Sequence, residues 1–130
     1  MNLIRNAHSS NPSVLALVDE LRAALGPGPD RLVLYFASPA HPVEALAAAM
    51  SRAFAPAAVL GCTTAGELVS GAMLKGSVVA MAFSEEVVSR LAFEVVTGLD
   101  RGLGGVEPAL RSLGAQLGTS MRELDPTRHV

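Results

Sequence analysis

The residues best suited to chemistry gather in one short segment, Gly61–Leu68. Small and polar residues dominate it: Gly61, Cys62, Thr63, Thr64, Gly66 and Glu67. The glycines let the backbone turn tightly or approach another molecule closely. The segment also supplies a thiol, two hydroxyls and a carboxylate, which are groups that bind or transform small molecules. We therefore predict that these residues form a ligand-binding loop.

Glu67 has the strongest claim to contact a ligand. Next to Gly66 and near two threonine hydroxyls, its carboxylate would receive an amine or hydroxyl group of a small molecule. The alternative is a loop carboxylate that is solvated or that caps local amides. The residues alone leave these two interpretations open.

Cys62 is the only cysteine of the chain. A thiolate near a basic group or a helix start would be an activated nucleophile. The more ordinary interpretation is a small buried residue at the end of a strand. His8 and His41 are candidate bases, but both lie beside predicted helix starts, where solvated loops are expected. A hydrolase or transferase that uses Cys62 is therefore the alternative function.

Metal and nucleotide patterns are incomplete. The three histidines and the cysteine occur at no spacing that a zinc site uses. The spacing of Gly71 and Gly76 fits a phosphate-binding loop, but Ser77 stands where the lysine is required. In the run 102–107, Glu107 replaces the third glycine of a dinucleotide motif. The sequence therefore predicts neither a metal nor a nucleotide site.

Apolar stripes with helical spacing predict three helices that would support the segment. The first begins at Ser9–Pro12, where capping side chains precede a proline, and it ends at Gly26–Pro29. The second runs between Pro42 and Pro56. The third lies within residues 106–118, where two internal glycines are expected to weaken it.

Short apolar runs predict strands at 32–36, 57–60, 77–83 and 90–97. The first two, joined by a helix, form a parallel βαβ unit. The last two are joined by too few residues for a helical crossover, so we expect them to be antiparallel. The predicted fold is α/β, with a mixed sheet of four to five strands and about three flanking helices. Ligands usually bind at the carboxyl ends of such strands, where Gly61–Leu68 begins.

Composition narrows the class of protein. The chain has 130 residues, a formal charge of −2 and no basic cluster, which argues against nucleic acid as a partner. A single cysteine excludes an internal disulfide and suits a reducing compartment. The N-terminus does not resemble a signal peptide, and no apolar run approaches the ~18 residues of a membrane span. We expect a soluble, cytoplasmic protein.

The segment Gly61–Leu68, followed by the apolar run Ser77–Phe83, resembles the signature of the FIST N-terminal domain. The resemblance extends over most of residues 5–118. It implies a sensory domain that works beside a signal-transduction partner and binds a small ligand, with amino acids proposed and haem bound by some members. It carries no catalytic residues, and so it disfavours the cysteine enzyme.

Two departures from the family pattern lead to further expectations. The family's N-terminal domain is longer and is normally followed by a C-terminal domain, so residues 1–130 are expected to be one sensory domain from a fragment or a shortened member. His8, His41 and His129 match no axial-ligand motif, which leaves haem as a minor possibility.

Ligand binding would alter an interface with the signalling partner. An exposed sheet edge would instead favour a homodimer.

Overall fold

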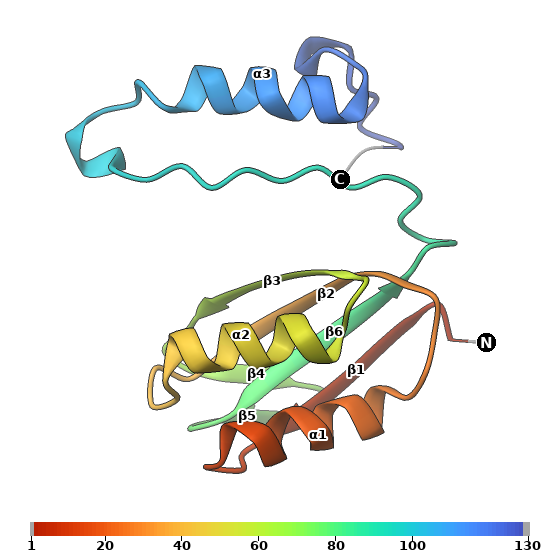
Figure 1. Ribbon diagram of the computed structural model, residues 1–130, viewed down its shortest axis with the longest axis vertical. Helices are drawn as coiled ribbons and strands as arrows, with labels where there is room; N and C mark the ends of the chain where they lie inside the picture. The colour runs from red at the N-terminus through yellow and green to blue at the C-terminus, as the bar shows by residue number, and fades with distance from the viewer. Residues whose placement is uncertain (1, 129–130) are drawn as a thin grey trace. The chain divides into compact units, whose positions relative to one another are not determined.

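A computed structural model describes residues 2–128 of the chain. The chain divides into two compact units, unit 1 (residues 1–89) and unit 2 (residues 90–130). Unit 1 contains the sheets and two helices, whereas the described part of unit 2 contains one α-helix, two short 3₁₀ helices and irregular segments (Figure 1). The predicted α/β class, with a mixed sheet flanked by helices, is confirmed.

The main sheet of unit 1 has four strands in the order β1-β6-β2-β3. They are β1 (Ile4–Ser9), β2 (Asp30–Ala37), β3 (Ala58–Thr63) and β6 (Val78–Ser84). β2 and β3 are parallel, which confirms the predicted βαβ unit, and β6 is antiparallel to both β1 and β2. β1 and β3 each pair with a single strand, so they form the two edges of the sheet.

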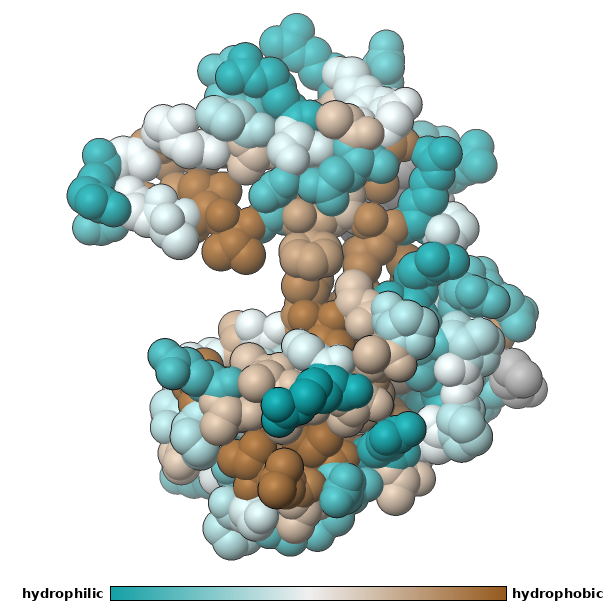
Figure 2. Space-filling view, in the orientation of Figure 1, coloured by the Kyte–Doolittle hydropathy of each residue, from teal (hydrophilic) through white to brown (hydrophobic). Residues whose placement is uncertain are grey.

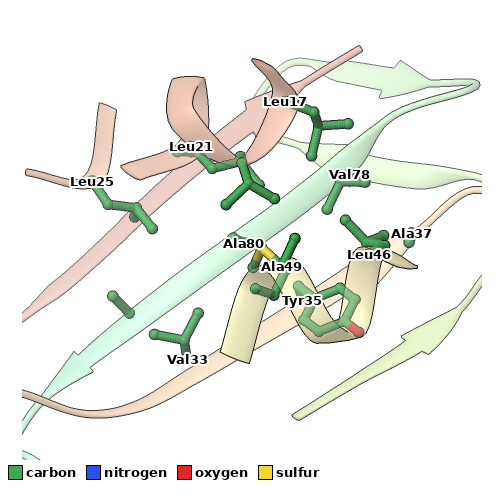
Figure 3. Packing of buried hydrophobic residues seen from close by; sticks show 14 residues of the cluster. Leu17, Leu21, Leu25, Val33, Tyr35, Ala37, Leu46, Ala49, Val78 and Ala80 are labelled. Atoms are coloured by element: carbon green, nitrogen blue, oxygen red, sulfur yellow. The ribbon is translucent and has the colours of Figure 1, made fainter. Parts of the chain in front are cut away.

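Two helices cover one face of this sheet, α1 (Val14–Leu25) and α2 (Val43–Ala53) (Figure 1). Side chains alternate between the faces of a strand, and the register aligns a central row on the helix side. That row consists of Ala7, Ala80, Tyr35 and Gly61. Leu17, Leu21 and Leu46 of the helices are fully buried against it (Figure 3). Each such leucine contributes about 1.5–3 kcal/mol through burial.

The other face of the sheet is also apolar. Its rows include Ile4, Leu34, Phe36, Leu60, Val79, Met81 and Phe83. Ile4 and Phe36 are 47% and 45% exposed. Figure 2 shows apolar side chains at the surface of each unit. Within unit 1, the helices therefore cover only one face of the sheet.

The segment Gly61–Leu68 is not the continuous loop that its glycines suggested. Residues 61–63 complete β3, residues 64–66 form a turn, and Glu67 begins β4 (Glu67–Val69). β4 pairs with β5 (Ala72–Leu74) in a two-stranded antiparallel sheet, which the apolar runs did not predict. The strand predicted at 57–60 is therefore longer than expected, because the backbone pairing with β2 continues through Thr63.

The N-terminal residues also differ from the prediction. Residues 4–9 form β1, and α1 begins at Val14 with Ser13 as its N-cap, rather than at Ser9–Pro12. Polar residues hid this edge strand from the hydrophobic pattern. One of them, Arg5, donates hydrogen bonds to the carbonyls of Leu25 and Gly26 at the end of α1. The predicted end of the helix at Gly26 is confirmed by its positive φ of 69°.

Unit 2 contains α3 (Val106–Leu117), as predicted, and two short 3₁₀ helices, Leu99–Arg101 and Met121–Glu123. Gly118 caps α3 in the left-handed conformation, so it ends the helix rather than weakening its interior. The strand predicted at 90–97 is wrong, because these residues form no strand. β6, its expected antiparallel partner, already pairs with β1 on one side and β2 on the other.

Candidate functional site

A small pocket opens at the carboxyl ends of β2 and β3, beside the start of α2. Its cavity volume is about 30 Å³, within about 260 Å³ of space between atoms that includes open solvent. It is lined by Tyr35 and Ala37 of β2, His41 of the following loop, Val43 and Leu46 of α2, and Gly61, Cys62 and Thr63 of β3. In α/β sheets, ligands bind outside the carboxyl ends of the strands, so the pocket lies at the edge suited to binding.

The Tyr35 ring forms one wall of the pocket and requires glycine at position 61. The two residues are partners in the parallel register of β2 and β3. A Cβ atom built on Gly61 would lie only 2.2 Å from Cζ of the ring. Real side chains do not approach so closely, so the absence of a side chain at Gly61 is what admits the ring. This glycine allows close approach within the protein itself.

The Tyr35 hydroxyl is the notable polar group of the pocket. The residue is only 7% exposed, yet among residues 2–128 no group hydrogen-bonds its hydroxyl. No fully buried side-chain oxygen or nitrogen in that range lacks a partner, so the hydroxyl is not sealed off from solvent, and Tyr35 lines the pocket. In Figure 3 it points away from the leucines of α1. Burial raises the pKa of the Tyr35 phenol, and a Cys62 thiolate would raise it further. The hydroxyl therefore keeps its proton at neutral pH.

His41 is held in place by the backbone before β6. Its side chain is buried, with Nε2 3.1 Å from the carbonyl oxygen of Gly76. A carbonyl only accepts hydrogen bonds, so Nε2 carries the proton and Nδ1 is left for other contacts. The expectation of a solvated loop histidine is wrong, because this hydrogen bond fixes the ring between the end of β2 and Gly76.

Glu67 lies at the base of the β4–β5 hairpin and is only 2% exposed. Thr64 Oγ1 donates to its Oε1 at 2.8 Å, and Ser77 Oγ donates to its Oε2 at 2.7 Å. Burial raises the pKa of the carboxyl, but hydrogen bonds from Ser77 and Thr64 outweigh that effect and lower it below the ordinary value of 4.5. Both oxygens are thus occupied by the protein, and the carboxylate does not line the pocket.

Backbone hydrogen bonds connect the same hairpin base to the end of β2. Ser38 N donates to Ser77 O at 2.8 Å, and Thr64 N donates to Ala37 O at 2.9 Å. Together with the bond from His41 to Gly76, they link the lining of the pocket directly to the start and end of the hairpin. The lining of the pocket and the hairpin are therefore connected by hydrogen bonds.

Cys62 is exposed, so the expectation of a buried packing residue is wrong. The reason is its place on an edge strand, in register with Phe36 on the face away from the helices. His8 belongs to the same row but lies three strands away, which at the usual strand spacing is about 14 Å. That separation is too large for proton transfer from the thiol to His8.

The structure therefore separates the predicted site residues into two groups. Gly61, Cys62 and Thr63 border the pocket, whereas Thr64, Gly66 and Glu67 form the turn and the hairpin base. Sequence reasoning missed Tyr35 as a site residue. The available signal was its position as the only tyrosine of the chain, inside an otherwise apolar strand ending beside the segment.

Two further searches cover the described part of the chain. Among residues 2–128, no three or more His, Cys, Asp or Glu side chains lie together as metal ligands would. In the same range, no helix is both long and apolar enough to cross a membrane.

Comparison with known proteins gives one match. The family model described as the FIST N domain matches residues 31–130. No curated protein and no solved structure matches the chain significantly.

Proposed function

Because this chain belongs to the FIST N domain family, a family of sensory domains in signal transduction, we propose that it senses a small ligand bound in the pocket between β2, β3 and α2. The matched range, residues 31–130, includes every residue that lines the pocket. In this proposal Gly61, Cys62 and Thr63 contact the ligand, with Tyr35 and His41 beside them.

The observation that supports this proposal is the Tyr35 hydroxyl. A buried hydroxyl without a hydrogen-bond partner costs roughly 1–3 kcal/mol. Water reaching the pocket reduces that cost in the free protein, and a ligand group can replace the water. A polar group in a mostly apolar concave site is the arrangement by which proteins orient small molecules.

The hairpin base supplies a route for the response. Thr64, Gly66 and Glu67 adjoin the pocket through the turn after β3, and Glu67 holds Ser77. A ligand that binds one arrangement of this region better than another shifts the population toward that arrangement. We propose that the shift changes an interface with a signalling partner in the cytoplasm. The role of Glu67 is then to transmit the change.

Haem, which the family resemblance raised, does not fit the histidines that the structure describes. His41 Nε2 is bonded to the carbonyl of Gly76, and the pocket beside the ring, about 260 Å³ including open solvent, is too small to enclose a macrocycle. His8 is exposed on the sheet face away from the helices, whereas an axial ligand needs to stand over a bound macrocycle. His129 lies outside the described residues. The proposed ligand is therefore a small metabolite.

A thermal-shift screen tests the proposal directly. The panel would contain amino acids, small organic acids, amides, alcohols and haem. A ligand at tenfold its Kd adds about 1.4 kcal/mol to the free energy of unfolding, which raises the Tm of a small domain by several degrees.

The matched variants are Thr63→Val, which replaces a pocket hydroxyl with a methyl group, and Thr97→Val, which makes the same change in unit 2. We expect Thr63→Val to reduce the ligand-induced shift and Thr97→Val to leave it unchanged. The proposed site would be contradicted if no compound in the panel stabilised the protein. It would also be contradicted if Thr63→Val left the ligand-induced shift in Tm unchanged.

A further inference from the structure

The lining of the pocket indicates the charge of its ligand. The polar side chains on its face of the sheet are the hydroxyls of Tyr35 and Thr63 and the imidazole of His41, whereas the Cys62 side chain lies on the opposite face. Within the described residues, no Asp, Glu, Lys or Arg side chain lines it. An ion in this pocket would lose hydration without gaining an opposite charge, which is costly.

Charged groups on neighbouring elements do not supply the missing counter-charge. Glu67 is buried nearby, but both its oxygens accept hydrogen bonds from Thr64 and Ser77. The amino end of α2 carries a partial positive charge, which the acidic Glu44 of its first turn offsets. Glu67 and Glu44 are both negative, so they disfavour an anionic ligand.

The hydrogen-bonding groups also favour an uncharged partner. The Tyr35 hydroxyl has a free proton to donate and lone pairs to accept. Thr63, in register with Ala37 on the same face as Tyr35, has a hydroxyl with the same two capacities. Leu46 and Val43 add aliphatic surface. A short aliphatic group bearing one amide or hydroxyl complements this combination.

We propose that the pocket selects a small uncharged molecule, an aliphatic amide or alcohol, over a carboxylate or zwitterion of the same shape. This inference rests on the proposed function, because it names the ligand class of the same pocket. It makes free amino acids poor ligands, since their two charges would remain unpaired there.

Isobutyramide and isobutyrate provide a matched pair of probes, because they share a shape and differ in charge. Binding of each to the full chain would be measured by NMR titration at about pH 8, above the ordinary pKa of histidine. For probes of this size we expect dissociation constants on the order of millimolar. Isobutyramide should bind at least about tenfold more tightly, a difference of about 1.4 kcal/mol.

Tyr35→Phe and Phe36→Leu form the matched pair of variants. Tyr35→Phe removes the pocket hydroxyl and should weaken isobutyramide binding several-fold. Phe36→Leu alters the adjacent residue on the opposite face and should leave binding unchanged. Equal or tighter binding of isobutyrate would overturn the uncharged-ligand inference, while the proposed site would stand. Absence of isobutyramide binding would also overturn the inference, and a charged hit in the thermal-shift screen would still support the site.

Discussion

The ring of Tyr35 lies where any side chain on Gly61 would have to stand, with the ring atom Cζ 2.2 Å from the position of a Cβ. The two residues face each other across the parallel strands β2 and β3. The contact matters for both the fold and the site. The Tyr35 ring packs in the core beneath α2 and also forms one wall of the pocket at the carboxyl ends of the strands.

The first prediction concerns Gly61→Ala. The added methyl group must displace a ring that is packed in the core, so we expect a loss of about 1–3 kcal/mol in the free energy of unfolding. Urea denaturation measures it. Gly66→Ala is the control, because a Cβ there would meet its nearest neighbour, Leu74 O, at an ordinary 3.7 Å. Similar losses in both variants would show that the ring does not limit position 61.

Combining the substitution with a smaller residue at position 35 isolates the contact. In a Tyr35→Val background, Gly61→Ala should cost less than in the wild type, because the clashing ring is gone. A coupling energy of about 0.5 kcal/mol or more is expected for residues in direct contact. Additive effects of the two substitutions would argue against the contact.

The second prediction is that Tyr35→Phe leaves the free energy of unfolding within about 0.5 kcal/mol of the wild type. The hydroxyl has no protein partner among residues 2–128, so its removal breaks no hydrogen bond within that range. Ser77→Ala offers the contrast, because it removes a hydroxyl that donates to buried Glu67, and it should cost about 1–3 kcal/mol. A large loss for Tyr35→Phe would mean that the hydroxyl serves the fold.

The third prediction concerns Glu67 and pH. Its folded-state pKa lies below the ordinary value of 4.5, so the ionised carboxylate stabilises the fold above that pH. This contribution is lost as the pH falls through the folded pKa. In Glu67→Gln, the pH dependence between neutral pH and the acid range should be shallower.

The same variant should be less stable at neutral pH by about 1–3 kcal/mol, because an amide cannot accept hydrogen bonds at both of its terminal atoms. Glu86→Gln, in the exposed loop after β6, is the control and should behave like the wild type. If Glu67→Gln keeps the pH profile of the wild type, as Glu86→Gln is expected to do, the ionised Glu67 carboxylate does not stabilise the fold.

The fourth prediction is that Cys62 reacts with a thiol reagent in the native protein without unfolding. Cys62 is exposed on an edge strand, so the reagent can reach the thiol in the folded protein. The alkylation rate of the native protein should stay within about tenfold of the rate in denaturant, because the thiol is accessible in both states. Rapid alkylation at a pH far below the ordinary pKa of thiols would instead support the cysteine-enzyme alternative.

Much of the fold of unit 1 was accessible from the sequence. Helices α1 and α2 pack against strands β2 and β6. Because this packing buries one face of each element, it appears in the sequence as apolar stripes and runs. β1 was missed because an edge strand with Arg5, Asn6 and His8 has polar residues on both faces. The strand expected at 90–97 has a suitable pattern but no available partner, and pairing is a property of the whole sheet.

The candidate site was accessible only in part. The segment after Leu60 was singled out because small residues follow a parallel strand there, and residues 61–63 do line the pocket. The close contact of Gly61 with the Tyr35 ring was not predicted, because it depends on the register between two strands. The burial of Glu67 depends on Ser77, ten residues away, and no local pattern encodes that distance.

The most direct test of ligand binding in the pocket is NMR mapping on methyl groups. The full chain would be titrated with the best stabilising compound while the methyl resonances of leucine, valine and threonine are followed. Binding in the pocket predicts saturable shifts centred on Val43, Leu46 and Thr63, which diminish in Tyr35→Phe. Saturable shifts centred elsewhere, with these three methyl groups unchanged, would contradict the proposed site.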